Sequence, residues 1–346
     1  MSAIPSKTNI DDNDTFSHLK VVRRYAQAER VVDTKSLDRS DWLAYRKQGI
    51  GSSDAAAAIG LNPYKSQLEL WMEKTGRSPV EASNDEASQD SALHWGTVLE
   101  PIVADQYALR TGYKVRRVNS VLRHPTKPWM LANLDREIVG QADVQVLECK
   151  TAGINGAKLW RDGVPEYVQV QVMHQLAVTG QQAADVAVLL GGQKLEIHRI
   201  TRNEAMIEKI ALLEQHFWQL VETDTPPPAD SSDSAGQALR WLFPTDDNKT
   251  VDFSQDLALS TTFDQLLRVR ADLSQLSDEE SLLRHQIQQA MGTSSVALFH
   301  NGRVSWKQSK ASERLDVTAL KSDHPELIAT YLKPVEGSRR FLVQAA

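Results

Sequence analysis

Hydrophobic and polar residues along the chain follow two different periods, one helical and one strand-like, as far as about residue 222. Apolar positions spaced three and four apart predict helices, and alternating or continuous apolar runs predict strands. The expected elements, in order, are helices over 40–48, 54–59 and 66–75, a helix that carries the apolar residues between 95 and 107 and ends before Gly112, strands over 113–122, 129–139 and 144–151, a helix over 165–179, strands over 184–190 and 194–200, and a helix over 203–222. This order predicts an α/β fold with a central mixed sheet flanked by helices.

Cap and breaker residues predict where the helices begin. We expect Ser40 to cap the first helix and Ser52-Ser53 to cap the second. The Ser66 capping box opens the third helix, and Pro101 must either begin or kink the fourth.

The composition divides the chain into four parts. Residues 1–22 are polar and aperiodic and predict a mobile tail, and residues 23–225 form the main domain. A Pro- and Ser-rich linker is expected over 226–240, followed by a smaller, mainly helical region over 241–346 that contains one β-hairpin. Residues 80–89 are polar and acidic and predict an exposed loop.

The C-terminal region carries a second hydrophobic pattern. Leu266, Val269, Leu273 and Leu276 show 3-4-3 spacing, and residues 277–280 have the composition of a helix cap ahead of further apolar positions. This pattern predicts either a helical hairpin or a short coiled coil. The region is a candidate for partner docking or self-association, and the alternative is a stabilising appendage.

Charge and cysteine content narrow the class of protein. The chain has 346 residues, a formal net charge of −6 and a single cysteine, Cys149. We expect neither membrane spanning nor secretion, because no apolar run is long enough and no signal-peptide core is visible. One cysteine excludes an intrachain disulfide and a four-cysteine metal site, which fits a reducing cytoplasm. The negative charge argues against coating of nucleic acid through bulk positive charge.

The main candidate for chemistry is Asp135 followed by Glu148-Cys149-Lys150, at the ends of two predicted strands. If the turn between them is centred between positions 141 and 142, Asp135 lies opposite Glu148, and Lys150 shares the face of Glu148. Oxygen ligands of this kind suit Mg²⁺, with Mn²⁺ as a substitute. The Cys149 side chain would point away, while its backbone carbonyl is a further candidate ligand. The alternative is a cross-strand ion pair on a solvated sheet.

Three further motifs precede this cluster: Gly49-Ile-Gly-Ser-Ser-Asp54, Leu61-Asn-Pro-Tyr64 and His94-Trp-Gly-Thr-Val-Leu-Glu100. Together with Asp135 and Glu148-Cys-Lys150 they resemble the YqaJ-type viral recombinase family, relatives of phage lambda exonuclease within the PD-(D/E)xK nucleases. The resemblance covers roughly residues 40–222 and implies a restriction-endonuclease-like core. Leu134 stands where the superfamily motif has proline, a change that leaves the aspartate in place.

The resemblance also implies roles for residues outside the two strands. Glu100 would join the metal site, and Gln171 would be an active-site glutamine. Gln175 lies one helical turn from Gln171, and it and His174 are interpreted as DNA or structural contacts.

Arg46 and Ser53, seven residues apart, match the family's pocket for a terminal 5'-phosphate. The physical chemistry agrees, because free N–H groups at a helix start and a two-pronged guanidinium both favour an anion. Without the resemblance, Ser53 would be a helix cap and Arg46 a surface charge.

The activity that the resemblance implies is Mg²⁺-dependent 5'-to-3' digestion of one strand of linear duplex DNA from 5'-phosphorylated ends. It also implies a single-strand annealing protein as partner in phage-type recombination, a homo-oligomer such as a trimeric ring, and a bacterial host cytoplasm. The alternatives are an endonuclease or single-strand exonuclease of the same superfamily, or a catalytically silent DNA-binding protein.

Overall fold

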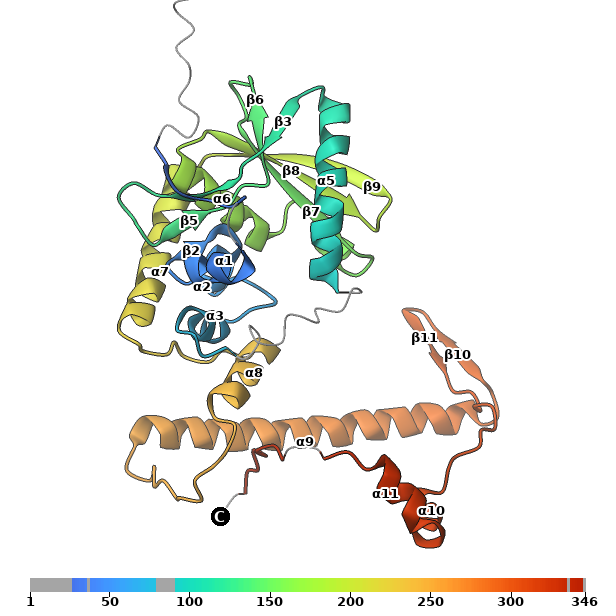
Figure 1. Cartoon of the computed structure of the whole chain (residues 1–346). Coiled ribbons are helices and arrows are strands. Elements are labelled where there is room, and N and C mark those ends of the chain that lie inside the picture. Colours follow the sequence, from blue (N-terminus) through green and yellow to red (C-terminus); the bar gives the residue numbers. More distant parts are fainter. Residues whose placement is uncertain (1–26, 36–37, 79–90, 335–336, 345–346) are drawn as a thin grey trace, which may run out of the picture. The chain divides into compact units, whose positions relative to one another are not determined.

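The computed structural model describes residues 27–35, 38–78, 91–334 and 337–344. The chain forms two compact units, residues 1–243 and 244–346 (Figure 1). The predicted tail over 1–22 and the predicted loop over 80–89 lie outside the described residues. None of the helices in the described ranges is both long and apolar enough to cross a membrane.

A five-stranded sheet with the order β3-β6-β7-β8-β9 forms the centre of the first unit. β7 and β8 run parallel while the other neighbours are antiparallel, so the sheet is mixed. β8 is a continuous apolar run with a single aspartate, as expected of a strand that is covered on both faces. The bounds are β3 Lys114–Arg117, β6 Arg136–Val139, β7 Val146–Ala152, β8 Ala183–Leu190 and β9 Lys194–Thr201.

A second, four-stranded sheet with the order β1-β4-β5-β2 accompanies it. Its bounds are β1 Glu29–Asp33, β2 Ile50–Gly51, β4 Ser120–Arg123 and β5 Met130–Ala132. Two of the expected strands are therefore wrong as single elements. The runs 113–122 and 129–139 each divide into one strand of the small sheet and one strand of the large sheet.

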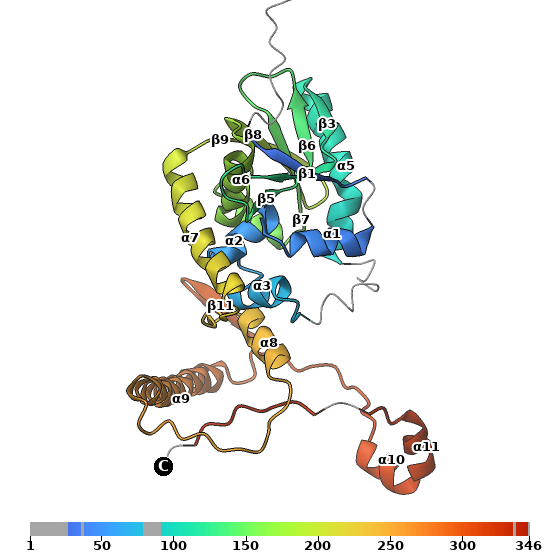
Figure 2. The same ribbon diagram turned by 60° about the vertical axis from the view of Figure 1, so that its left-hand side comes forward.

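Helices cover both faces of the large sheet, which confirms the predicted α/β class (Figure 2). α6 packs on a cluster containing Val186 and Val188, whereas α5 packs on one containing Leu147 and Ala187. Alternate residues of the strands therefore serve two cores. The helices of this unit are α1 Arg39–Arg46, α2 Ala55–Ala58, α3 Gln67–Lys74, α5 Ala92–Thr111, α6 Glu166–Thr179, α7 Glu204–Glu222 and α8 Asp233–Leu242, with 3-10 turns η1 Ser52–Asp54 and η3 Gly156–Trp160.

Two of the expected helix caps are wrong. Asp38, not Ser40, caps α1 and accepts a 2.8 Å hydrogen bond from the Asp41 N–H, because the helix begins earlier than expected. The residue ahead of η1 is Gly51, and no side chain caps that turn. Ser66 does cap α3, as predicted, by accepting from the Glu69 N–H at 3.1 Å. Pro101 lies inside α5.

The predicted linker over 226–240 is wrong in its second half. Residues Asp233–Leu242 form α8, whose Ala235 and Ala238 are completely buried against the rest of the first unit. The Ser234 hydroxyl accepts a 2.8 Å hydrogen bond from the Ser66 N–H and donates to the Glu69 carboxylate. Small residues on one face of α8 permit this close packing, so the first unit ends at Phe243.

The second unit contains one long helix, α9 Leu257–Met291, a hairpin of β10 Val296–Phe299 and β11 Gly302–Ser305, and two short helices, α10 Val317–Asp323 and α11 Pro325–Tyr331. The β-hairpin was expected. The expected helical hairpin is wrong, because residues 277–280 continue α9 instead of capping a second helix. The other expectation from the same pattern, a short coiled coil, stays a prediction.

Candidate active site

The two carboxylates predicted from the sequence meet where the chain passes from the small sheet into the large one. Asp135 is the residue immediately before β6. β6 pairs with β7 in the predicted register, since Arg136 faces Leu147, which places Asp135 opposite Glu148. Asp135 Oδ2 accepts a 2.8 Å hydrogen bond from the Cys149 backbone N–H. The Asp135 carboxylate therefore lies against the edge of β7, just before the first residue of β6.

Glu148 is held by three side-chain donors. Lys150 Nζ lies 2.8 Å from Glu148 Oε1, and Gln171 Nε2 donates to the same oxygen at 2.6 Å. Gln175 Nε2 donates to Glu148 Oε2 at 2.7 Å, and Lys150 Nζ also donates to Gln171 Oε1 at 2.8 Å. The carboxylate of Glu148 is therefore fixed in orientation by one lysine and two amides.

Gln175 and His174 of α6, both interpreted from the sequence as DNA or structural contacts, have different surroundings in the structure. Gln175 is completely buried and contacts Glu148, so it supports the site and does not lie on a DNA-facing surface. Its spacing of four residues from Gln171 was the signal for this. His174 is also completely buried, and its ring nitrogens lie 2.7 Å from Glu214 Oε1 and 2.9 Å from the Leu131 carbonyl oxygen. His174 is therefore a structural contact.

The electrostatics of the cluster follow from two carboxylates sharing one site. Burial and the charge of Glu148 raise the pKa of Asp135 to about 8. Burial lowers the pKa of Lys150, but the Glu148 carboxylate outweighs this effect and raises it overall. Burial also raises the pKa of the Cys149 thiol, so this side chain is a protonated core residue at neutral pH. The cluster favours a further positive charge beside the carboxylates.

Glu100, on α5, lines the same cavity but forms an ion pair with Arg136, a residue that the sequence analysis did not identify. Its Oε1 lies 2.5 Å from Arg136 Nη1, and Arg136 also donates to the Asp135 carbonyl oxygen at 2.6 Å. Within the described residues, no three His, Cys, Asp or Glu side chains are grouped as a metal site. The structure thus brings Asp135 and Glu148 together, and it places Glu100 beside them in an ion pair.

The atoms that could still bind a metal ion at this site are all oxygen atoms, which suit a hard divalent cation. Asp135 and Glu148 offer carboxylate oxygens. The Cys149 carbonyl lies on the same strand edge as its N–H, which faces Asp135. Mg²⁺ is commonly held by one or two carboxylates and completes its shell with water and substrate phosphate. Burial and the charge of Glu148 raise the pKa of Asp135, and the Lys150 ammonium offsets this effect only in part.

Arg46 and Ser53 form a second group at the other end of the cavity. Arg46 Nη2 lies 3.5 Å from Ser53 Oγ, and its guanidinium stacks over the Trp42 ring at 4.9 Å. The closer partner of Arg46 is Asp54, whose Oδ1 lies 2.8 Å from Nη2. Ser53 belongs to the 3-10 turn η1 and is exposed, so it is not a helix cap.

Asp54 and Lys74 are site residues that the sequence analysis did not identify. Lys74 Nζ donates to Asp54 Oδ2 and to the Arg46 carbonyl oxygen, both at 2.7 Å, and the Asp54 and Lys74 side chains are buried. Burial alone would raise the pKa of Asp54, but the charges of Lys74 and Arg46 outweigh it and lower the pKa well below its usual range. Asp54 is therefore an anion that holds the guanidinium of Arg46. The only sequence signal was an aspartate closing the Gly49–Asp54 motif.

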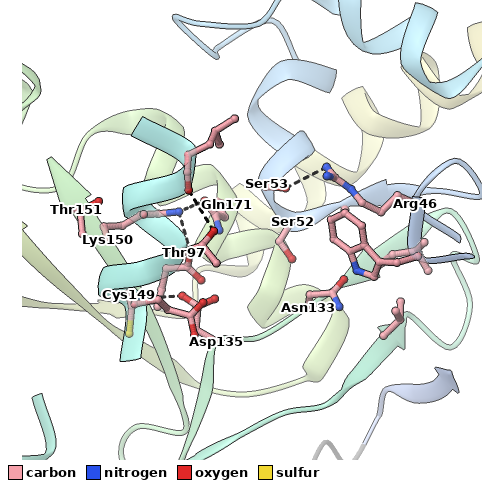
Figure 3. A pocket seen from close by; sticks show the side chains of 18 of the residues that line it. Arg46, Ser52, Ser53, Thr97, Asn133, Asp135, Cys149, Lys150, Thr151 and Gln171 are labelled. Atoms are coloured by element: carbon pink, nitrogen blue, oxygen red, sulfur yellow. Dashed lines mark hydrogen bonds and ion pairs between the residues drawn. The ribbon is translucent and has the colours of Figure 1, made fainter. Parts of the chain in front are cut away.

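One cavity of about 450 Å³ joins the two groups. Figure 3 shows Asp135, Lys150 and Gln171 on one side and Arg46 with Ser53 on the other. Ser52 and Asn133 lie between them, and the buried Ser52 hydroxyl has no hydrogen-bond partner among the described residues. Polar groups therefore lie along the path from the carboxylate pair to the arginine, beside the apolar side chains of Leu93, Val121 and Leu131.

Comparisons with known proteins give the family of the chain. A family model described as the YqaJ-like viral recombinase domain matches residues 41–182. The chain is 36% identical over 306 residues to a protein of Bacillus subtilis (strain 168) described as uncharacterized protein YqaJ, covering 87% of this chain and 93% of the relative.

Two further matches cover less of the chain. A protein of African swine fever virus is 34% identical over 77 residues, which cover 22% of this chain and 21% of that protein. An alkaline exonuclease crystal structure from Laribacter hongkongensis aligns with a TM-score of 0.44 and 22% identity, covering 54% of this chain and 93% of the other. On the near full-length similarity to YqaJ and the matching domain, the chain belongs to the YqaJ-like viral recombinase family.

Proposed function

We propose that the protein is a Mg²⁺-dependent deoxyribonuclease that digests one strand of linear duplex DNA, 5' to 3', from 5'-phosphorylated ends. The observation that carries the proposal is the single cavity that joins the Asp135–Glu148 carboxylate pair and Lys150 to the Arg46 guanidinium. Such a cavity has one end suited to a metal-assisted reaction at a phosphate and another end suited to binding a phosphate. Membership of a recombinase family supports DNA as the substrate.

Asp135, Glu148 and the Cys149 carbonyl would hold the metal ion, and Mn²⁺ would be accepted by the same all-oxygen ligands. When bound, the ion supplies a more acidic water and neutralises charge on the phosphate. Glu100 would be available to join them only if it exchanges its contact with Arg136, which lies 2.5 Å away.

The chain's own residues have separable roles in this proposal. Lys150, whose ammonium is held by Glu148 and Gln171 at 2.8 Å, would stabilise the negative charge that develops on the scissile phosphate. Gln171 therefore positions Lys150 as well as Glu148. At the other end of the cavity, Arg46 binds the terminal phosphate with two N–H groups, and the Ser53 hydroxyl adds a neutral donor.

The proposal extends to the biological setting. A nuclease that exposes single strands supplies the substrate of a single-strand annealing protein, so we place the protein with such a partner in phage-type recombination in a bacterial cytoplasm. Encirclement of the duplex by a homo-oligomeric ring, such as a trimer, belongs to the same proposal and would make digestion processive.

The test is digestion of linear duplex DNA with 5'-phosphate or 5'-hydroxyl ends, beside covalently closed circles, with and without Mg²⁺. We expect the phosphorylated linear DNA to be degraded and the circles to remain intact. Asp135→Asn should abolish degradation, whereas Asp143→Asn should not, because Asp143 is an exposed residue paired with Arg199 outside the cavity. Arg46→Lys keeps the charge beside Asp54 but loses the two-pronged contact, so it should reduce the preference for phosphorylated ends.

Each alternative predicts a different result. Cleaved circles would indicate an endonuclease, and digestion of single strands alone would indicate a single-strand exonuclease. Binding of DNA without metal-dependent cleavage, unchanged in Asp135→Asn, would indicate a catalytically silent DNA-binding protein.

A further inference from the structure

The long helix α9 has almost no packing partner within the second unit. It spans 35 residues, and Met291 at its end is the only one of these residues that is buried in the part of the chain that the structure describes. Leu273, Leu276 and Leu283 are 60%, 59% and 52% exposed. Helices in water depend mainly on packing of an apolar face for their stability, so a helix of this length with exposed leucines lacks a partner.

The apolar residues of α9 follow a heptad repeat. Starting from Leu266 as position a and Val269 as position d, the pattern continues through Leu273, Leu276, Leu283 and Ile287. Residues at a and d form one continuous seam when two helices supercoil around each other. We call this set the α9 seam, and it consists of Leu266, Val269, Leu273, Leu276, Leu283 and Ile287.

One polar residue interrupts the seam at an a position. Glu280 lies there, with Arg284 Nη1 3.6 Å from its carboxylate. In a parallel, in-register pair the two Glu280 side chains face each other, and this like-charge contact lowers the stability of the pair. The guanidinium of Arg284 in the same helix, 3.6 Å from the Glu280 carboxylate, offsets part of that repulsion.

The charges beside the seam decide which partner and orientation are compatible. Asp272 and Glu279 occupy g positions, and Arg270 and Arg284 occupy e positions. In a parallel pair of identical helices, g faces e of the next heptad, so Glu279 of one copy faces Arg284 of the other. In an antiparallel pair, e faces e and g faces g, which sets arginine against arginine and acid against acid. The charge pattern therefore complements a second α9 in parallel.

The β10–β11 hairpin does not fill the seam. A groove of about 630 Å³ remains between the hairpin and the helix, lined by Leu276, Leu283, Ile287 and Trp306. Exposed apolar grooves of this kind are typical of protein–protein contacts.

We propose that α9 associates in parallel with α9 of a second copy of this chain through the α9 seam, with Glu279 paired to Arg284 across the interface. This surface lies wholly within the second unit, and the inference does not depend on the proposed nuclease activity. It adds to the chain a self-association surface separate from any contact between nuclease domains.

Cysteine cross-linking of the full-length protein tests the proposal directly. The natural cysteine, Cys149, is buried. In a parallel pair, Leu276 of one copy faces Leu276 of the other, whereas Leu282, at position c, points outward. Leu276→Cys should give a disulfide-linked species of about 77 kDa, twice the 38.6 kDa of one chain, and Leu282→Cys should not. The two leucines are 59% and 58% exposed, so they are matched in accessibility.

Failure of Leu276→Cys to cross-link, or equal cross-linking by Leu282→Cys, would overturn the proposal. A result in which the Leu276→Cys protein binds another protein instead of its own copy would identify a different occupant and also overturn it. Activity on DNA plays no part in this readout, so the outcome is distinguishable from failure of the proposed function.

Charge reversal tests the orientation. Arg284→Glu sets Glu279 against a glutamate in a parallel pair and should weaken association by about three- to tenfold in analytical ultracentrifugation. The double variant Glu279→Arg with Arg284→Glu should restore it. If the double variant associates no better than Arg284→Glu, the parallel arrangement is wrong. Circular dichroism of each variant shows whether α9 remains helical.

Discussion

The buried Asp54–Lys74 pair holds the Arg46 guanidinium at the wall of the cavity. Lys74 binds both the Asp54 carboxylate and the Arg46 carbonyl oxygen at 2.7 Å, so one ammonium fixes the backbone and the side-chain partner of the arginine. A phosphate ligand would meet a guanidinium whose orientation is already set. Such preorganisation reduces the entropy lost on binding.

This pair predicts a specific pH dependence of stability. The pKa of Asp54 is lower in the folded protein than its ordinary value of 3.8, because Lys74 and Arg46 outweigh the effect of burial. A depressed folded pKa contributes stability above the unfolded pKa that is lost as the pH falls through the folded pKa. Asp54→Asn should lower the free energy of unfolding at pH 7 by about 3–5 kcal/mol, because Lys74 remains buried without its counter-charge.

The measurement is urea unfolding of the wild type and Asp54→Asn at pH 7 and pH 3. The difference between the two proteins should narrow at pH 3, because the unfolded wild type takes up a proton at Asp54 below its ordinary pKa of 3.8 while the folded wild type keeps the ion pair. Asp143→Asn serves as the control, because Asp143 is 58% exposed in its pair with Arg199. Equal differences at both pH values would show that Asp54 is not the charged partner of Lys74.

At the residue scale, the sequence predicted the contacts that depend on strand register and missed those that depend on tertiary packing. Asp135 and Glu148 were placed opposite each other because the hairpin turn fixes their alignment. Lys74 and Arg136 carry no local pattern, because their partners Asp54 and Glu100 lie 20 and 36 positions away along the chain. Only the folded chain brings such residues together.

At the scale of elements, β-propensity identified the apolar runs but not their division between two sheets. The run 129–139 is continuous in sequence, yet β5 pairs with β4 while β6 pairs with β7. Asn133, Leu134 and Asp135 form the crossing between the sheets. The propensity of a residue reports that it fits a pleated surface, and it does not say which neighbouring strand it will pair with.

α6 is joined to α7 and β5 by the buried His174–Glu214 pair. His174 has an acceptor at each ring nitrogen, the Glu214 carboxylate at 2.7 Å and the Leu131 carbonyl oxygen at 2.9 Å. A ring with two acceptors is satisfied only when both nitrogens carry protons, so the imidazolium is the form that fits. Burial alone would lower the pKa of His174, but Glu214 and the hydrogen bonds outweigh it and raise the pKa.

We therefore predict that the stability contributed by this pair decreases as the pH rises. A raised folded pKa gives stability that is complete below the unfolded pKa, about 6.5, and is lost as the pH rises through the folded pKa. Glu214→Gln should remove this dependence and lower the free energy of unfolding by about 3–5 kcal/mol at pH 6.

Urea unfolding at pH 6 and pH 9 measures the effect, and the difference in free energy of unfolding between wild type and Glu214→Gln should be smaller at the higher pH. Glu208→Gln on the exposed face of α7 provides a matched control that should follow the wild type. If the wild type and Glu214→Gln lose stability in parallel over this range, His174 is neutral in the folded protein.

At the scale of the whole molecule, composition predicted that a boundary between two units lies near residues 226–240, but it did not predict that the first unit ends at Phe243. Pro226-Pro227-Pro228 and the small polar residues after them predicted a linker, yet α8 follows within the same stretch. Ala235 and Ala238 are weak signals in sequence because alanine is frequent in both linkers and helices. Their burial against α3 becomes visible only when the core that they cover is assembled.

The boundary makes a prediction about truncated chains. A chain ending at Phe243 retains α8, whose Trp241 and Leu242 pack against the cluster that contains Trp71 and Phe217. A chain ending at Thr225 exposes that cluster and should be less stable by about 2–4 kcal/mol, the value expected for losing the burial of one or two large side chains. Thermal and urea unfolding of the two fragments would measure the difference.

The same two fragments distinguish the role of the cavity in the first unit from that of the α9 seam in the second. Because the first unit contains the whole cavity from Asp135 to Arg46, the chain ending at Phe243 should keep metal-dependent hydrolysis of DNA. It lacks α9 and should lose the self-association that the α9 seam supports. If this fragment unfolds as readily as the one ending at Thr225, α8 does not stabilise the first unit. Retention of fold and hydrolysis, with loss of the association through α9, would establish that catalysis and the α9 seam reside in different units.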